Sequence, residues 1–66
     1  MSELRKRRKS LGKSISKVSQ EAGVNASVLS WVELGRCTCS AAFRAALANF
    51  YREDESVLFN EAGFAR

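Results

Sequence analysis

The strongest constraint on the fold of this chain is a connection of only three residues between two short helical patterns. The first pattern follows a capping serine and places apolar or small residues at i, i+3, i+4 and i+7 of one helix face: Ile15, Val18, Ser19 and Ala22. The connection, residues 23–25, starts with a glycine, which readily adopts the left-handed conformation that ends a helix. Because a turn of this length joins two helices at about 90–120°, the sequence predicts a helix-turn-helix unit over about residues 14–35.

The second helix of this unit has two faces of different character. It lies between a capping asparagine at position 25 and a terminating glycine at position 35. On a helical wheel, one face carries Leu29, Val32 and Glu33. The opposite face carries Ser27, Trp31 and Leu34. Large apolar groups that face solvent are usually covered by a binding partner, so this outward face is predicted to bind one.

The remaining patterns complete an all-α prediction. A first helix is expected over residues 2–11 and a short fifth helix over residues 54–63. The fourth helix starts at a capping serine at position 40 and has the most regular periodicity: Phe43, Ala46, Leu47, Phe50 and Tyr51. β-Branched residues do not alternate, and no Asn-Gly or Asp-Gly hairpin turn occurs. The sequence therefore predicts one compact domain of four to five helices over residues 1–66, with the helix-turn-helix at its centre.

Charge is distributed unevenly along the 66 residues. The chain has 11 Lys and Arg against 7 Asp and Glu, which gives a net charge of +4. Residues 1–36 contain eight basic and three acidic side chains, a net of +5, whereas residues 37–66 have a net of −1. A basic excess on so small a body favours a polyanionic partner, and it belongs to the half that contains the predicted helix-turn-helix.

Composition also excludes several classes of protein. The chain has no histidine and only two cysteines, Cys37 and Cys39, so it cannot assemble a four-ligand zinc site and both are expected to be ordinary thiols. No nucleophile–base or paired-carboxylate arrangement is recognisable, so we expect the chain to have no enzymatic activity and no cofactor. No apolar run approaches the roughly 18–20 residues of a membrane span, and no apolar leader follows the basic start. We expect a cytoplasmic protein that does not enter membranes.

Residues 18–36 contain the most specific motif of the chain. They read VSQEAGVNASVLSWVELGR, in which Gly-Val is followed by apolar-x-x-apolar-Glu-x-Gly. This spacing resembles the helix-turn-helix of the phage repressor and Cro (XRE) family, and the resemblance extends over roughly residues 4–51. It implies four or five helices, a transcriptional regulator that binds double-stranded DNA sequence-specifically, and a third helix that enters the major groove. Ile15 stands where the family usually has a glutamine that touches phosphate.

The resemblance and the outward face together give a set of candidate DNA contacts. Base contacts are expected from the start and the outward stripe of the third helix: Asn25, Ala26, Ser27, Ser30 and Trp31. Phosphate contacts are expected from cations and N–H or O–H donors that flank this helix: Lys13, Lys17, Arg36, Thr38 and Ser40. The basic cluster over residues 5–9 is either a further contact or a solvated face.

Two charged residues interrupt otherwise apolar stripes. The first predicted helix has Leu4 and Leu11 as its stripe, with Arg8 between them, and Glu33 lies on the inward face of the third helix. An unpaired charge at the edge of a core is costly, so we expect Arg8 and Glu33 to pair. The arginine–glutamate contact of the family falls on these two positions.

Alternative partners follow from the same residues. A protein-interaction module of the same fold would dock Trp31 and Leu34 onto another protein. The resemblance also implies a two-fold dimer through the C-terminal helix, for which Phe59 and Phe64 are the candidate contacts. A membrane-surface helix is disfavoured, because the basic segment has only two apolar residues on one stripe.

Overall fold

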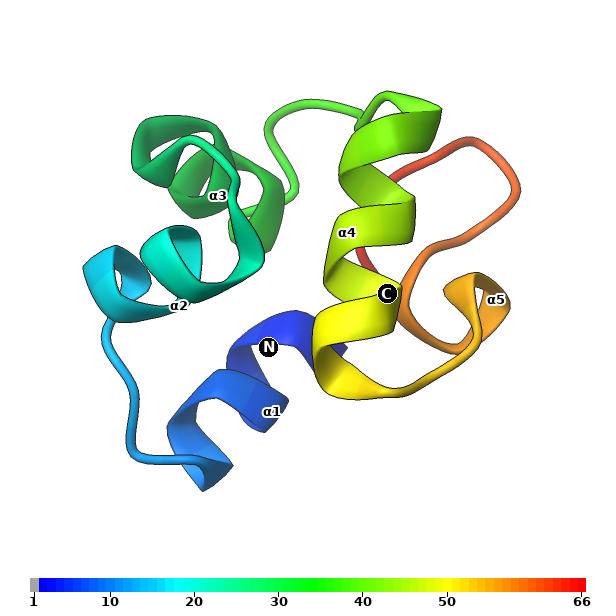
Figure 1. The fold of residues 1–66 in the computed structure, drawn as a ribbon. Helices are drawn as coiled ribbons and strands as arrows, with labels where there is room; N and C mark the ends of the chain where they lie inside the picture. Colours follow the sequence, from blue (N-terminus) through cyan, green and yellow to red (C-terminus); the bar gives the residue numbers. More distant parts are fainter. Residues whose placement is uncertain (1) are drawn as a thin grey trace.

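Five helices make up the fold in a computed structural model, which describes residues 2–66 (Figure 1). They are α1 (Glu3–Ser10), α2 (Ile15–Ala22), α3 (Ala26–Glu33), α4 (Ala41–Tyr51) and α5 (Glu55–Leu58). Within residues 2–66 the only β-type pairing is an isolated antiparallel bridge between Phe59 and Ala65. The predicted all-α class and the helix-turn-helix formed by α2 and α3 are confirmed.

Side-chain caps set where four of the helices begin. The hydroxyl oxygen of Ser14 accepts a hydrogen bond from the backbone N–H of Lys17 at 3.1 Å, and the hydroxyl oxygen of Ser40 accepts one from Phe43 at 3.2 Å. Ser2 caps α1 in the same way, and the side-chain oxygen of Asn25 caps α3. These contacts satisfy N–H groups that have no partner inside the helix, so each boundary is fixed by local sequence.

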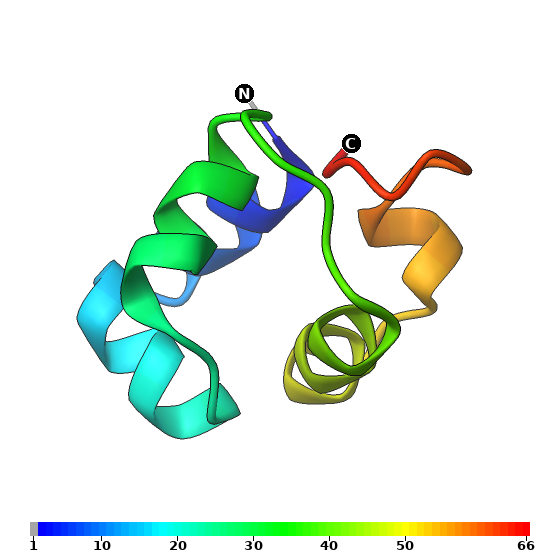
Figure 2. The same ribbon diagram turned by 90° about the horizontal axis from the view of Figure 1, so that it is seen from above.

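The turn between α2 and α3 depends on one glycine. Gly23 has a φ of 74°, and its N–H donates to the carbonyl of Ser19 at 2.9 Å, which closes the end of α2. Ser19 is buried between the helices, and its hydroxyl donates to the carbonyl of Ser16 at 2.8 Å. A small side chain with a satisfied hydroxyl lets α2 and α3 pack closely. Figure 2 shows α1, α2 and α3 as one group, which an extended connection joins to α4 and α5.

A single hydrophobic core unites the two groups. Its fully buried large side chains come from all five helices: Leu4, Val18, Leu29, Val32, Leu47 and Leu58. Leu47 belongs to the regular stripe of α4, and Leu29 and Val32 form the predicted inward face of α3. Burial of these residues helps to hold α3 with its other face outward.

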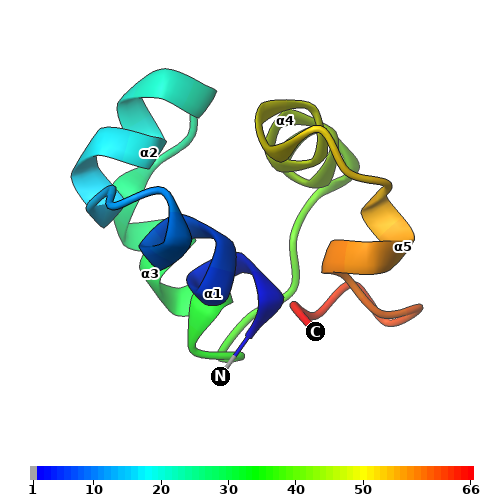
Figure 3. The same cartoon turned by 90° about the horizontal axis from the view of Figure 1, so that it is seen from below.

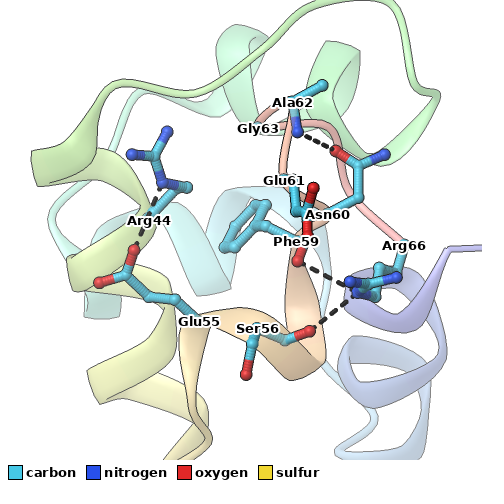
Figure 4. A pocket seen from close by; sticks show the side chains of 9 residues that line it. All are labelled: Arg44, Glu55, Ser56, Phe59, Asn60, Glu61, Ala62, Gly63 and Arg66. Atoms are coloured by element: carbon cyan, nitrogen blue, oxygen red, sulfur yellow. Dashed lines mark hydrogen bonds and ion pairs between the residues drawn. The ribbon is translucent and has the colours of Figure 1, made fainter.

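The C-terminal end differs from the sequence prediction. The helix expected to reach residue 63 ends at Leu58, because the Oδ1 of Asn60 accepts the N–H groups of Ala62 and Phe64, each at 3.0 Å, and forms a turn. Arg66 then returns to α5, where its Nε donates to the carbonyls of Ser56 and Phe59 (Figure 4). The carbonyl of Arg66 accepts from the N–H of Glu3, so the end of the chain lies against the start of α1.

This arrangement corrects two expected side-chain positions. Phe59 is only 2 % exposed and belongs to the core, so its assignment as a dimer contact was wrong, and only Phe64 of that pair is exposed. Leu11 is 54 % exposed, although it was expected on the inward stripe of the first helix. It is the C-cap of α1, and Gly12, with a φ of 68°, turns the chain away before Leu11 can reach the core.

Arg8 of α1 and Glu33 of α3 form an ion pair at the edge of the core. The Nε of Arg8 lies 3.0 Å from Oε2 of Glu33, and the Nη2 lies 3.1 Å from Oε1. A further hydrogen bond of 3.0 Å joins the Nη1 of Arg8 to the carbonyl of Lys13. The side chain of Glu33 is only 3 % exposed and that of Arg8 is 13 % exposed. A bidentate contact of this kind fixes the distance between α3 and α1 and the rotation of α3.

We predict that the Arg8–Glu33 pair is strongly coupled. Replacing either residue by Ala leaves the partner charge buried, which should lower the free energy of unfolding by about 2–4 kcal/mol, and the double variant should lose less than the sum. Urea denaturation of the four proteins measures this coupling. Lys6→Ala is the matched control, because Lys6 forms an exposed pair with Glu3 at 3.8 Å and its loss should cost less than about 0.5 kcal/mol. Small, additive losses at Arg8 and Glu33 would contradict the prediction.

Candidate nucleic-acid interface

The outer face of α3 is an exposed stripe with two large apolar side chains. Trp31 is 52 % exposed and Leu34, the C-cap of the helix, is 54 % exposed. Ser27 lies one turn before Trp31 and is exposed, while Ala26 and Ser30 are half-buried beside them. The stripe therefore offers apolar contact and a few hydroxyl groups, and it has no charged side chain.

Asn25 stands at the N-terminal end of this stripe. Its Oδ1 accepts a hydrogen bond from the N–H of Val28 at 3.1 Å and is used for capping. The residue is exposed, so the side-chain NH₂ group is available as a donor of two hydrogen bonds. The same asparagine can start the helix and still meet an acceptor outside it.

The connection from α3 to α4 carries exposed polar groups. The N–H of Arg36 donates to the carbonyl of Trp31 at 2.9 Å, while the guanidinium of Arg36 is exposed and forms no ion pair with any residue of the range 2–66. Thr38 and Ser40 are also exposed. Free N–H groups at the start of α4 follow directly, and the positive end of the helix dipole lies there. The connection and the start of α4 therefore offer groups suited to an anion.

Cys39 anchors the connection to the rest of the fold. Its N–H donates to the carbonyl of Gly63 at 3.2 Å, and its carbonyl accepts from the Nη1 of Arg44 at 2.6 Å. Burial raises the pKa of the Cys39 thiol to about 11, with a smaller contribution from Cys37, so Cys39 stays a neutral thiol at physiological pH. The residues on either side of Cys39 are therefore held beside the turn at Gly63 and α4.

The two lysines near the start of α2 differ in their surroundings. The Nζ of Lys17 lies 3.8 Å from Oε2 of Glu21, and its side chain is largely exposed. The Nζ of Lys13 donates to Oε1 of Glu21 and lies 5.7 Å from the centroid of the Phe50 ring. Lys13 also lowers the pKa of Glu21, mainly through this hydrogen bond. A phosphate at Lys13 would have to replace the carboxylate of Glu21, whereas Lys17 is accessible as it stands.

The basic cluster over residues 5–9 is divided between structural and solvated roles. The Nη1 of Arg7 donates to Oε1 of Glu53 at 3.0 Å, which ties α1 to the end of α4. Lys6 pairs with Glu3 within α1, and Lys9 is exposed. Sequence reasoning missed the contact between Arg7 and Glu53, because the two residues are 46 positions apart and neither lies on an interrupted apolar stripe.

The fold and this face define a helix-turn-helix protein, and the comparison with known families agrees. A family model described as "Helix-turn-helix domain" matches residues 2–58, and the chain belongs to this family. Membership indicates DNA binding, since the helix-turn-helix is a DNA-binding domain. Neither a curated protein nor a solved structure gave a significant match.

No helix among residues 2–66 is long and apolar enough to cross a membrane. The same part of the chain contains no group of three or more Cys, Asp or Glu side chains arranged to hold a metal ion.

Proposed function

We propose that the chain is a transcriptional regulator of the phage repressor and Cro type, which binds double-stranded DNA sequence-specifically with α3 in the major groove. The observation that carries the proposal is the exposed stripe of α3, which the exposed Arg36 follows in the chain. The match to the helix-turn-helix family supports the DNA-binding part of it. We also propose that residues 1–66 act as one domain, since all five helices contribute to one core.

In this proposal α3 recognises the DNA sequence mainly through apolar contacts with bases. Trp31 and Ala26 would meet thymine methyl groups, and the hydroxyls of Ser27 and Ser30 would serve as donors or acceptors to base edges. The NH₂ group of Asn25 adds a donor where the helix enters the groove. Because these groups offer few paired hydrogen bonds, part of the discrimination would come from DNA shape, and specificity should be modest.

Phosphate contacts would supply most of the affinity. Arg36 and Lys17 provide exposed charge at two flanks of α3, while Thr38 and Ser40 provide hydroxyl donors. Lys13 would join them after exchanging Glu21 for a phosphate. Phosphates are contacted without regard to sequence, so these residues would position α3 and would not choose the site.

A protein-interaction module of the same fold is the second candidate function. The exposed Trp31 and Leu34 favour it, because together they form an apolar surface that another protein can cover. The two functions differ in their dependence on salt, since neutralising phosphates releases counterions and an apolar protein interface does not.

We predict a steep salt dependence of DNA binding. If roughly 4–6 phosphates are neutralised per chain, the logarithm of the binding constant should fall with the logarithm of salt concentration with a slope of about −3 to −5. Fluorescence anisotropy with a labelled duplex, titrated from low to physiological salt, measures this slope. Binding whose affinity barely changes over that range would favour the protein-interaction module.

We also predict that Trp31 and Arg36 have separate roles. Trp31→Ala should weaken binding to a duplex selected from a random pool by about 1–3 kcal/mol and leave binding to unselected DNA nearly unchanged, whereas Arg36→Ala should weaken both alike. Gel-shift titrations of both variants on both duplexes separate these effects. Val57→Ala is the matched control, because Val57 is exposed on α5 and should affect neither. If Trp31→Ala unfolds the domain or weakens both duplexes equally, Trp31 does not read bases.

A further inference from the structure

A pocket of about 320 Å³ lies where the end of α1 meets the end of α4. Six residues line it: Arg7, Ser10, Leu11, Phe50, Tyr51 and Arg52. In Figure 1 the ends of α1 and α4 are at the bottom of the molecule and α3 is at the top, and Figure 3, seen from below, shows α1 in front of α3. The pocket is therefore separate from the outer face of α3, and Lys13, 5.7 Å from the centroid of the Phe50 ring, is the candidate phosphate contact that lies near it.

The floor of this pocket is apolar and accessible. Leu11 is 54 % exposed, and Phe50 is half-buried beside it. The ring of Phe50 meets the ring of Tyr51 edge-on, with centroids 4.9 Å apart, so the two rings hold each other in place. An exposed leucine next to two aromatic rings offers a binding site for an apolar side chain, and no residue of α2 or α3 lines this site.

The rim of the pocket is basic, and its donors are incompletely used. No acidic residue lines the pocket. Arg52 is exposed and pairs with no carboxylate in the described chain. Arg7 binds Glu53 through Nη1, and its side chain is 31 % exposed.

We propose that this pocket is a docking site for an acidic segment of a partner protein, in which one leucine- or phenylalanine-sized side chain is flanked by Asp or Glu. The apolar side chain would cover Leu11 and Phe50, and the carboxylates would meet Arg52 and Arg7. A second copy of the chain is a poorer occupant. A symmetric contact would bring the Arg7 and Arg52 side chains of both copies together, and like charges in an interface are unfavourable.

The geometry also sets how this site relates to DNA binding. Because the pocket and α3 lie on opposite sides of the molecule, a partner can occupy the pocket while α3 is in contact with a duplex. The chain then acts as a link between DNA and an acidic protein. The docking site itself does not depend on DNA binding, and either activity can be present without the other.

An NMR titration of the full chain tests the proposal. The probe is the peptide acetyl-Glu-Asp-Leu-Phe-Asp-Glu-amide, and the control peptide has Gln and Asn in place of Glu and Asp. We expect the acidic peptide to shift the backbone amides of residues 7–11 and 49–53, with and without bound duplex. The uncharged peptide should bind at least about fivefold more weakly, as expected for lost charge pairing at a partly desolvated site.

Variants of exposed residues identify the contacts without disturbing the core. Leu11→Ser and Arg52→Gln should each weaken binding of the acidic peptide by about fivefold or more, and Val57→Ser, at another exposed apolar position, should leave it unchanged. The proposal is overturned if the two peptides bind equally or if the acidic peptide shifts only α3. It is equally overturned if duplex DNA displaces the peptide, or if the pocket amides shift on dilution without peptide, which would reveal a second copy as the occupant.

Discussion

The ion pair between Arg8 and Glu33 is the contact on which the presentation of α3 depends. Glu33 lies on the same helix face as Leu29 and Val32, and it is nearly as buried as they are. Its carboxylate cannot remain there without a cation, so α3 is stable only when this face meets Arg8 on α1. Once that rotation is fixed, Ser27 and Trp31 must face outward. The outer face is thus a consequence of how the inner face is paired.

The position of α3 then determines what the outer face can do chemically. A stripe with Trp31 and Leu34 as its largest groups suits apolar contact more than the paired hydrogen bonds that distinguish bases most strongly. Charge is placed at the flanks, at Arg36 and Lys17, and the connection that carries Arg36 is held by the buried Cys39. This division separates affinity, which the flanks would supply, from selectivity, which the stripe would supply.

Sequence reasoning succeeded where structure is determined locally. The caps at Ser14, Asn25 and Ser40 and the left-handed turn at Gly23 depend on residues within one helical turn, and each prediction was confirmed. The two faces of α3 followed from periodicity alone.

Positions that depend on distant segments could not be predicted in this way. Phe59 is buried because the chain reverses at Asn60 and Arg66 binds back onto α5, and no periodic pattern signals that reversal. Leu11 falls outside the core because α1 ends at Ser10, one residue before it. The candidate DNA contacts could be predicted only in part. The sequence predicts the outward stripe of α3, but it does not predict that Lys13 binds Glu21.

An amide chemical-shift map of the full chain on a duplex selected from a random pool tests most directly whether α3 is the DNA-reading element. The account predicts that the largest shifts lie in α3, in residues 34–40 and at the start of α2, with little change in α5 or at the end of the chain. Large shifts confined to α1 and α5, with the amides of α3 unmoved, would contradict it.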